Sequence, residues 1–313
     1  MRKPVTILLG AMAALWLGNT SLWTAPSDTP PRLIAHRGVH QLSLAERTND
    51  SCRAQHVAPI THDFVENTLP SIREATRLGA DMVEVDVHLT PDGTFALFHD
   101  WRLECQTNGT GVTEQQDFAT LQALDLGYNI TADGLTFPFR GKGLIMPSLT
   151  GALAAPSAPL LINYKSRRPE EGTAIAPLHA AFPGRIAAIY GGAPPSEAAH
   201  AATGLPYYTK DSTKSCLMRY ALLGWTGHVP DACQTGLVAV PLNVGPWLWG
   251  WPHRLTARMH AAGSEVILLG DYDGSGFSSG IDDEGLLARV PKGWSGYLWT
   301  NRIEWLGPRV KTR

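Results

Sequence analysis

Charged residues are scarce in this 313-residue chain, at 17% of the total, and neither sign dominates. Lys and Arg number 26 against 28 Asp and Glu, so the formal net charge is −2, and no run of basic residues occurs. Binding to a phosphate backbone by counterion release needs such basic clusters. A glycine-rich phosphate loop after a strand-like segment is also missing. These absences exclude nucleic acid as a partner and argue against a nucleotide cofactor.

No apolar run reaches the roughly 20 residues that a membrane-spanning helix needs. One uncharged stretch, residues 5–17, follows two basic residues and precedes Ala25, an arrangement typical of a secretory signal. We therefore expect residues 1–25 to form a signal peptide or an uncleaved N-terminal anchor. Residues 26–313 are then expected to form one exported domain, either periplasmic or secreted.

Cysteine is also rare, with four residues and no CxxC pair, which weakens a zinc-site interpretation. An exported protein meets an oxidising compartment, where disulfides form and persist. Four cysteines allow three pairings. We favour Cys52 with Cys105 and Cys216 with Cys233, because this choice keeps the partners closest in the sequence.

Apolar residues, by contrast, make up 44% of the chain and include ten Trp, enough for a large core. Helix-compatible segments separate several short apolar runs, and this alternation of β and α units predicts a TIM (β/α)₈ barrel. An open doubly wound sheet is the alternative. The eight expected strands lie at residues 32–36, 82–87, 160–165, 185–190, 205–209, 237–242, 265–269 and 296–300.

A further strand-like run, residues 95–99, follows the second expected strand after the turn at residues 90–93. This connection is too short for a parallel crossover, so it predicts an antiparallel β-hairpin. The hairpin would fold His99 back over the end of the second strand. Residues of about 101–147 then form an insertion that we expect to cap the mouth of the barrel, beside a second excursion at residues 41–65.

Polar residues follow three of these apolar runs. His36 and Arg37 end the first strand, Glu84 and Asp86 end the second, and His99 ends the hairpin. Barrel enzymes keep their active sites at the carboxyl ends of the strands. Two carboxylates on one face of a buried strand repel each other unless a cation lies between them, and oxygen ligands favour Mg²⁺ or Ca²⁺. Histidines beside such a cation suit proton transfer, and Arg suits a phosphate group.

Asn163 and Lys165 share one face of the third expected strand. Lys165 could point inward and bind an anion, or it could be a solvated charge at the strand end. The carboxylates of Glu84 and Asp86 could likewise form a structural ion pair rather than a metal site. The residues alone leave both choices open.

The order of these motifs resembles the glycerophosphodiester phosphodiesterase family. The resemblance implies a TIM barrel with a small insertion after the second strand, and metal-dependent hydrolysis of glycerophosphodiesters to sn-glycerol 3-phosphate and an alcohol. The motifs are His36-Arg37-Gly38, Glu66-Asn67-Thr68-Leu69-Pro70, the segment 79–93, Phe98-His99-Asp100 and, more weakly, Met146-Pro147-Ser148-Leu149, Ile162-Asn163-Tyr164-Lys165 and Trp299-Thr300-Asn301-Arg302.

Carried over by position, the resemblance makes His36 and His99 the general acid/base pair and Arg37 a phosphate contact. It makes Glu84 and Asp86 two ligands of one divalent cation, either Ca²⁺ or Mg²⁺. It does not say which histidine is the base. It also leaves open whether water or the substrate's own glycerol hydroxyl attacks the phosphorus.

Two motifs depart from the family pattern. The third metal ligand is usually the carboxylate of a Glu-x-Lys pattern, but here that position is Asn163, followed by Lys165 as a phosphate contact. An amide oxygen can still bind Ca²⁺ or Mg²⁺, with weaker affinity because one charge is lost. In the closing motif, Asn301 stands where the family commonly has Asp. Glu66 is expected to orient its loop or Arg37 rather than to bind metal.

Trp247, Trp249 and Trp251 form a dense aromatic loop after the sixth expected strand. They could bind a choline-like cation, dip into a membrane interface, or pack against the rim of the barrel. One alternative function is a phospholipase D-like enzyme on the same scaffold, acting on a lysophospholipid or sphingolipid. Another is a non-catalytic phosphodiester-binding envelope protein, which the amide at Asn163 motivates.

Overall fold

The computed structural model describes residues 2–44, 52–274 and 279–311. Within these residues eight parallel strands follow one another in the order β6-β5-β4-β2-β1-β9-β8-β7. A parallel bridge between Tyr207 and Gly236 joins β6 to the residue before β7 and closes the ring. The closed barrel confirms the predicted fold and rules out the open sheet. The strands are β1 Arg32–Ala35, β2 Met82–Leu89, β4 Leu160–Tyr164, β5 Ile186–Gly191, β6 Tyr207–Tyr208, β7 Leu237–Pro241, β8 Glu265–Leu269 and β9 Tyr297–Thr300.

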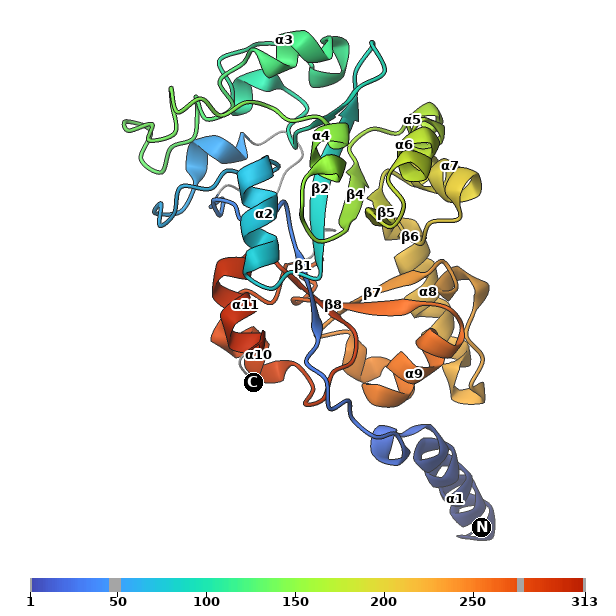
Figure 1. The fold of residues 1–313 in the computed structure, drawn as a ribbon. Coiled ribbons are helices and arrows are strands. Elements are labelled where there is room, and N and C mark those ends of the chain that lie inside the picture. The colour runs from blue at the N-terminus through green and yellow to red at the C-terminus, as the bar shows by residue number, and fades with distance from the viewer. Residues whose placement is uncertain (1, 45–51, 275–278, 312–313) are drawn as a thin grey trace.

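Helices surround the strands (Figure 1). Their starts follow from local sequence: Thr68 accepts a hydrogen bond from the Ser71 amide at the start of α2, and Thr209 and Ser212 form a capping box on α8. The helices of the barrel are α2 Leu69–Arg77, α4 Leu149–Ala154, α5 Pro169–Ala174, α6 Ala176–Ala181, α7 Ala193–Thr203, α8 Lys210–Leu223, α9 His253–Ala261, α10 Glu284–Arg289 and α11 Ile303–Lys311.

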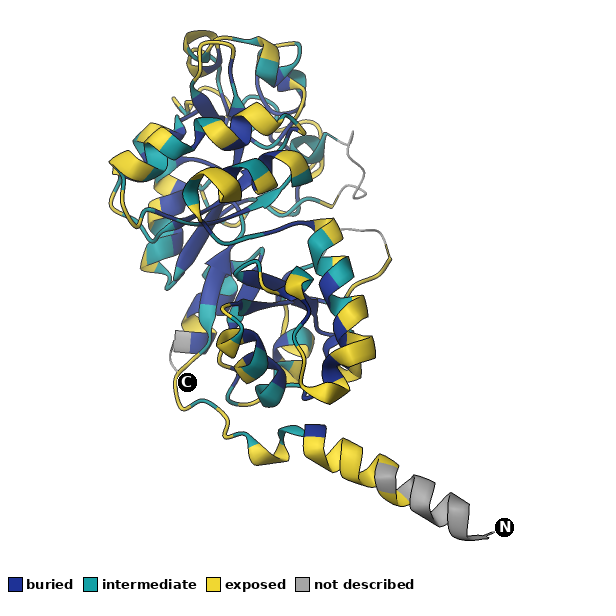
Figure 2. Ribbon diagram, turned by 90° about the vertical axis from the view of Figure 1, so that its right-hand side faces the viewer, coloured by how far each residue is buried: buried dark blue, intermediate teal, exposed yellow. Residues whose placement is uncertain are grey.

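Strand side chains alternate between two apolar layers. Figure 2 shows most of the strand ribbon in dark blue, the colour of buried residues. One layer, including Val83, packs against the helices, and the other, including Ile34 and Leu161, fills the interior of the barrel. Glu84 lies opposite Leu161 in the register of β2 and β4, so its side chain faces the interior. The apolar interior layer therefore supports a polar layer at the carboxyl ends of the strands.

The predicted hairpin and insertion are both present. Strand β3, Phe95–Leu97, pairs antiparallel with β2. The insertion contains the short helix α3, Phe118–Gln122, and packs around its own apolar cluster, which includes Leu121 and Phe139. In Figure 1 it lies at the top, beyond the end of β2. Residues 45–51 of the neighbouring excursion lie outside the described part of the chain.

Both favoured disulfides form, Cys52 with Cys105 and Cys216 with Cys233. The first joins the insertion to the excursion at residues 41–65, as expected. The second joins α8 to the turn before β7. No cysteine of the described chain is free.

Near the N-terminus, helix α1 Arg2–Asn19 projects from the barrel (Figure 2), and a short 3₁₀ helix follows it at Ser21–Trp23. The end of α1 is joined to the barrel: Asn19 donates to the Trp225 carbonyl at 2.9 Å, and Arg258 donates to Asn19 at 2.9 Å. The Ser21 hydroxyl accepts from the His253 amide at 3.0 Å, at the first turn of α9. Among the described residues, no helix has the length and apolar character to cross a membrane.

Two indoles of the aromatic loop have packing or hydrogen-bond partners in the protein, and the third is exposed. The Trp249 indole donates to the Ala221 carbonyl at 2.9 Å, and Trp251 packs against Trp294 with ring centroids 5.5 Å apart. Trp247 is 83% exposed. Packing against the rim therefore accounts for two of the three indoles.

Glycines in two helices differ in the space around them. A Cβ on Gly172 of α5 would overlap the Pro195 carbonyl and lie 2.7 Å from the Ala199 amide nitrogen, whereas a Cβ on Gly151 of α4 meets only Ser148, at 3.4 Å. We expect Gly172→Ala to lower the free energy of unfolding by about 1–3 kcal/mol. Gly151→Ala, as control, should raise it by about 0.4–1 kcal/mol. Denaturant titrations measure both, and equal effects would contradict the close approach of α5 and α7.

Candidate active site

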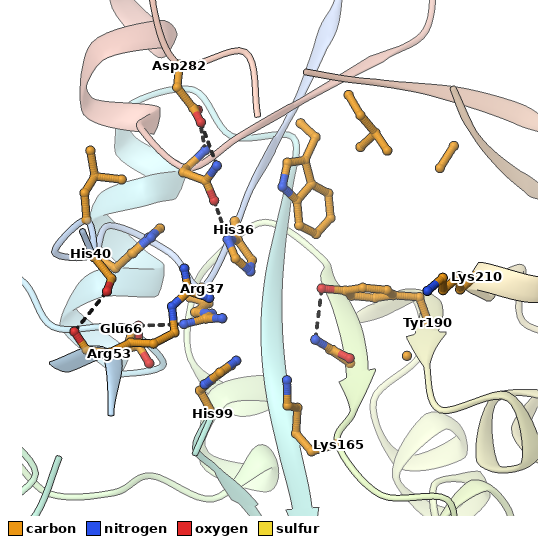
Figure 3. A pocket seen from close by; sticks show the side chains of 18 of the residues that line it. His36, Arg37, His40, Arg53, Glu66, His99, Lys165, Tyr190, Lys210 and Asp282 are labelled. Carbon is orange, nitrogen blue, oxygen red and sulfur yellow. Dashed lines mark hydrogen bonds and ion pairs between the residues drawn. The ribbon is translucent and has the colours of Figure 1, made fainter. Parts of the chain in front are cut away.

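A cavity of about 900 Å³ opens at the carboxyl ends of the strands. In the view of Figure 3, His36, Arg37 and His99 line one side, and Lys165 and Tyr190 lie across from them. Six of the eight residues that the sequence predicts for catalysis, phosphate contact, orientation or metal binding line this cavity. The other two, Glu84 and Asp86, are buried carboxylates below it. The lining residues that the sequence predicted are His36, Arg37, Glu66, His99, Asn163 and Lys165.

Glu84 and Asp86 are fully buried on β2, with only Val85 between them in the sequence. Burial, and then the negative charge of Asp86, raises the pKa of Glu84 to about 8. Burial would also raise the pKa of Asp86, but Lys165 and Arg37 outweigh it and hold that pKa below its usual range. The pair therefore concentrates a negative charge that its surroundings only partly balance.

Arg37 is the main positive partner of this pair. Its amide donates to Glu84 Oε2 at 2.8 Å, its Nε lies 3.2 Å from Asp86 Oδ2, and its Nη1 donates to Glu66 Oε2 at 3.0 Å. The contact with Glu66 agrees with the expected orienting role of that residue. Asn67 adds two hydrogen bonds to Asp86, both at 3.0 Å.

Both Arg37 and Asn67 have a φ of +56°, in the left-handed region that non-glycine residues rarely adopt. Such strain persists only where surrounding contacts over-determine the conformation. Here those contacts are the hydrogen bonds to the buried carboxylates. Sequence analysis recognised Asn67 only as part of a motif and gave it no role.

Asn163 lies next to both carboxylates, as its predicted role requires. Its amide nitrogen is 3.0 Å from Glu84 Oε1, 2.7 Å from Asp86 Oδ1 and 2.9 Å from the Tyr190 hydroxyl. Asp86, whose pKa is lowered, is ionised and only accepts hydrogen bonds, so the amide hydrogens must face the carboxylates in this arrangement. The amide would have to rotate for its oxygen to bind a cation.

Tyr190 completes this polar layer, and sequence analysis missed it. Its hydroxyl donates to Glu84 Oε1 at 2.7 Å, and burial followed by the charge of Glu84 raises the pKa of Tyr190 well above its usual value. Tyr190 on β5 pairs in register with Asn163 on β4. The alternation of side chains along β5 was the available signal, but it needed the strand register.

The two histidines have different partners. His36 Nδ1 lies 2.6 Å from Asn301 Oδ1, and its Nε2 lies 3.8 Å from Glu84 Oε2. His99 Nδ1 lies 2.8 Å from Asp100 Oδ1. Burial, and then Arg37, lowers the pKa of both histidines well below the usual value. Both rings are therefore neutral near pH 7 and able to accept a proton.

The cavity continues beyond these groups along α8. Its lining there is mixed: α8 contributes Lys210, Thr213 and Lys214 as well as the apolar Leu217 and Met218, and Val244 and Tyr272 also line the cavity. The described residues that line the cavity do not include the three indoles of the aromatic loop. The choline-binding interpretation of that loop therefore gains no support.

Residues 36–173 match the Glycerophosphoryl diester phosphodiesterase family. An uncharacterized protein of Mycobacterium tuberculosis is 30% identical over 136 residues, which are 42% of this chain and 45% of that protein. Human Glycerophosphodiester phosphodiesterase 1 is 39% identical over 69 residues, 22% of this chain and 21% of that protein. The chain thus spans less than half the length of these curated relatives.

Solved structures share the fold. The glycerophosphoryl diester phosphodiesterase domain of the same Mycobacterium tuberculosis protein gives a TM-score of 0.61 at 20% identity, covering 90% of this chain and 99% of that one. A phosphodiesterase from Oleispira antarctica, solved with the product sn-glycerol-3-phosphate, gives 0.56 at 20% identity, covering 90% and 96%. These similarities support the barrel architecture.

We expect Asn163→Glu to tighten the binding of Ca²⁺ or Mg²⁺ on the order of tenfold, because it adds a third negative charge to the oxygen ligands. The same change should lower the melting temperature of the metal-stripped protein, since it removes amide hydrogens that two carboxylates now accept. Calorimetric titration and thermal melts measure the two effects. Asn163→Gln, which stays neutral, is the control. An unchanged or weaker affinity in Asn163→Glu would count against position 163 as a ligand.

Proposed function

We propose that this chain, which belongs to the glycerophosphoryl diester phosphodiesterase family through residues 36–173, hydrolyses glycerophosphodiesters to sn-glycerol 3-phosphate and an alcohol. One observation above all supports this function. Two half-buried, neutral histidines share one cavity with Arg37 and Lys165, next to a buried pair of carboxylates. A phosphodiester needs positive charge to bind and groups that move protons to be cleaved, and this cavity offers both.

Arg37 and Lys165 bind the phosphodiester in this proposal. The Arg37 side chain is held by Glu66 and Asp86, and Lys165 Nζ lies 3.5 Å from Asp86 Oδ1. Groups held in this way keep their position as charge develops on the phosphoryl oxygens, so they stabilise the transition state without a cost of reorganisation.

His36 and His99 carry the proton transfers. One imidazole takes the proton of the attacking hydroxyl as its oxygen bonds to phosphorus. The other enters the step as imidazolium, with a proton taken from water under the negative charge of the bound phosphodiester, and gives that proton to the departing alkoxide as its P–O bond breaks. The attacking hydroxyl is that of water or of the glycerol moiety of the substrate. In the second case a cyclic phosphate forms first and water opens it, with the histidines exchanging roles.

The residues fit a divalent cation, either Ca²⁺ or Mg²⁺. Two fully buried carboxylates, one with a pKa raised to about 8, are relieved of their repulsion when a cation lies between them. Glu84 and Asp86 would hold it, together with Asn163 once its amide has rotated. When bound, the cation supplies Lewis-acid polarisation of the phosphoryl oxygens.

The apolar residues among the cavity lining beside α8 favour one second candidate, a phospholipase D-like activity on a lysophospholipid or sphingolipid. An acyl chain could lie along Leu217, Met218, Val244 and Tyr272, whereas a water-soluble glycerophosphodiester leaves them uncovered. Faster release of the headgroup alcohol from lysophosphatidylcholine than from glycerophosphocholine would select this candidate. A non-catalytic binding protein is disfavoured, because it has no chemical use for two histidines in such a cavity.

Export remains part of the proposal, and two observations support it. Both disulfides form, as they do in an oxidising compartment. The hydrogen bonds of Asn19 and Ser21 to the barrel favour an N-terminal segment that stays attached to the domain, since cleavage after Ala25 would remove them. Trp247, which is 83% exposed, is the indole of this loop that we propose for a peripheral membrane contact.

We expect the metal-stripped full chain to release sn-glycerol 3-phosphate from glycerophosphocholine or glycerophosphoethanolamine once Ca²⁺ or Mg²⁺ is added. His36→Ala and His99→Ala should each lower the rate by about 10²–10⁴, because each removes a group that moves a proton. An enzymatic assay for sn-glycerol 3-phosphate measures the rate.

His260→Ala is the control variant, since His260 lies on α9 with its side chain 77% exposed. It should keep the full rate, and circular dichroism should show all three variants folded. Near-normal turnover in His36→Ala or His99→Ala would remove that residue from the chemistry. A folded wild-type chain that hydrolyses neither substrate with either metal would refute the proposed function.

A further inference from the structure

Asp282 lies in the loop before α10 and has no assigned role, yet it is linked to the site by hydrogen bonds (Figure 3). Its Oδ2 accepts from Asn301 Nδ2 at 2.6 Å and from the Gly280 amide at 3.2 Å. Its Oδ1 accepts from the Asn301 amide at 2.7 Å and from the Thr300 hydroxyl at 2.9 Å. Four donors therefore hold this carboxylate in one position at the end of β9.

The carboxylate decides which way the Asn301 side chain faces. A carboxylate accepts hydrogen bonds and does not donate them, so the NH₂ group of Asn301 must face Asp282. The carbonyl oxygen of Asn301 then faces His36 Nδ1, at 2.6 Å. An amide oxygen only accepts, so Nδ1 must carry the hydrogen. In neutral His36 the lone pair is consequently on Nε2.

Packing contacts hold the His36 ring in one position. Its ring centroid lies 5.1 Å from that of Trp299 and 5.5 Å from that of His40, which meets it edge-on. Its backbone amide donates to the Thr300 carbonyl at 3.0 Å. With the ring position set by these contacts, the partner of Nδ1 decides which nitrogen holds the proton.

We propose that Asp282 is a positioning residue that acts through Asn301 to hold His36 in its Nδ1–H tautomer, with the Nε2 lone pair available to the reaction. The consequence for hydrolysis rests on the proposed function, whereas the tautomer itself does not. Nε2 lies 3.8 Å from Glu84 Oε2, at the edge of the polar layer. It is thus the His36 nitrogen placed to exchange a proton with the substrate or with the attacking hydroxyl.

Asp282→Asn tests this role. The new amide at position 282 can still accept from Thr300 and from the backbone of Asn301 with its oxygen, and its NH₂ group then faces the NH₂ group of Asn301. We expect the Asn301 amide to rotate and present its NH₂ group to His36 Nδ1, which moves the hydrogen to Nε2. Turnover should fall at least about tenfold through kcat, within the range of general acid–base catalysis, with KM changed less than about threefold.

Exchanging the carboxylate and the amide between positions 282 and 301 restores a hydrogen-bond acceptor opposite His36 Nδ1. In the double variant Asp282→Asn/Asn301→Asp, the amide at position 282 donates to the carboxylate at position 301, which accepts from His36 Nδ1. The Nδ1–H tautomer should return, and kcat should recover to within about fivefold of wild type. A residue with only a structural role gives no reason for a second substitution to restore activity.

The tautomer is read directly by ¹⁵N NMR of protein labelled at histidine, with the His36 signals identified by their loss in His36→Ala. Asp283→Asn is the matched control: this neighbouring carboxylate caps α10 by accepting from the Leu286 amide at 2.9 Å, and Asn serves equally well as a cap. It should change neither the tautomer nor kcat. Melting temperatures show whether each variant is folded.

Several results would overturn the role of Asp282. One is a wild-type His36 that carries its hydrogen on Nε2, which needs no variant to be observed. The role would also be refuted if Asp282→Asn kept both the Nδ1–H tautomer and full kcat. It would be refuted as well if the folded double variant regained neither the tautomer nor kcat. Because the NMR measurement needs no substrate, a wild-type chain without hydrolytic activity would refute the proposed function and leave the tautomer result to stand alone.

Discussion

Two carboxylates inside the barrel impose the constraint to which the rest of the site responds. Glu84 and Asp86 are removed from water and repel each other, a combination that costs free energy unless positive charge and hydrogen-bond donors surround it. Arg37 supplies both, and Asn67 and Asn163 supply donors. Two of these three residues adopt left-handed backbone conformations, which their hydrogen bonds to the carboxylates help to stabilise.

The barrel makes this concentration of charge possible. Parallel strands end at the same edge, so residues distant in sequence reach one polar layer, and the apolar layer beneath excludes water from below. The insertion covers part of the opening, since Gln106 and Ile130 line the cavity. A low-dielectric surrounding strengthens each charge–charge interaction in the site, including those with a bound phosphodiester.

Burial also sets the chemistry of the histidines. Removed from water and close to Arg37, His36 and His99 are neutral near pH 7, which is the form that accepts a proton. A neutral imidazole has two different nitrogens, and its neighbours choose between them. In His36, Nδ1 is linked through Asn301 to Asp282 in the loop before α10, so this loop takes part in the arrangement of the site.

The sequence by itself determined the barrel, its hairpin, the cysteine pairs and the histidine, arginine and carboxylate residues of the site, because strand ends and short motifs are local patterns. Only the tertiary structure revealed the contacts of Tyr190, Asp282 and Asn301, which lie 106, 19 and 265 residues along the chain from their respective partners. It also decided that Trp249 and Trp251 pack inward. Such contacts depend on strand register and on closure of the barrel, and no local pattern encodes which side chains those long-range pairings bring together.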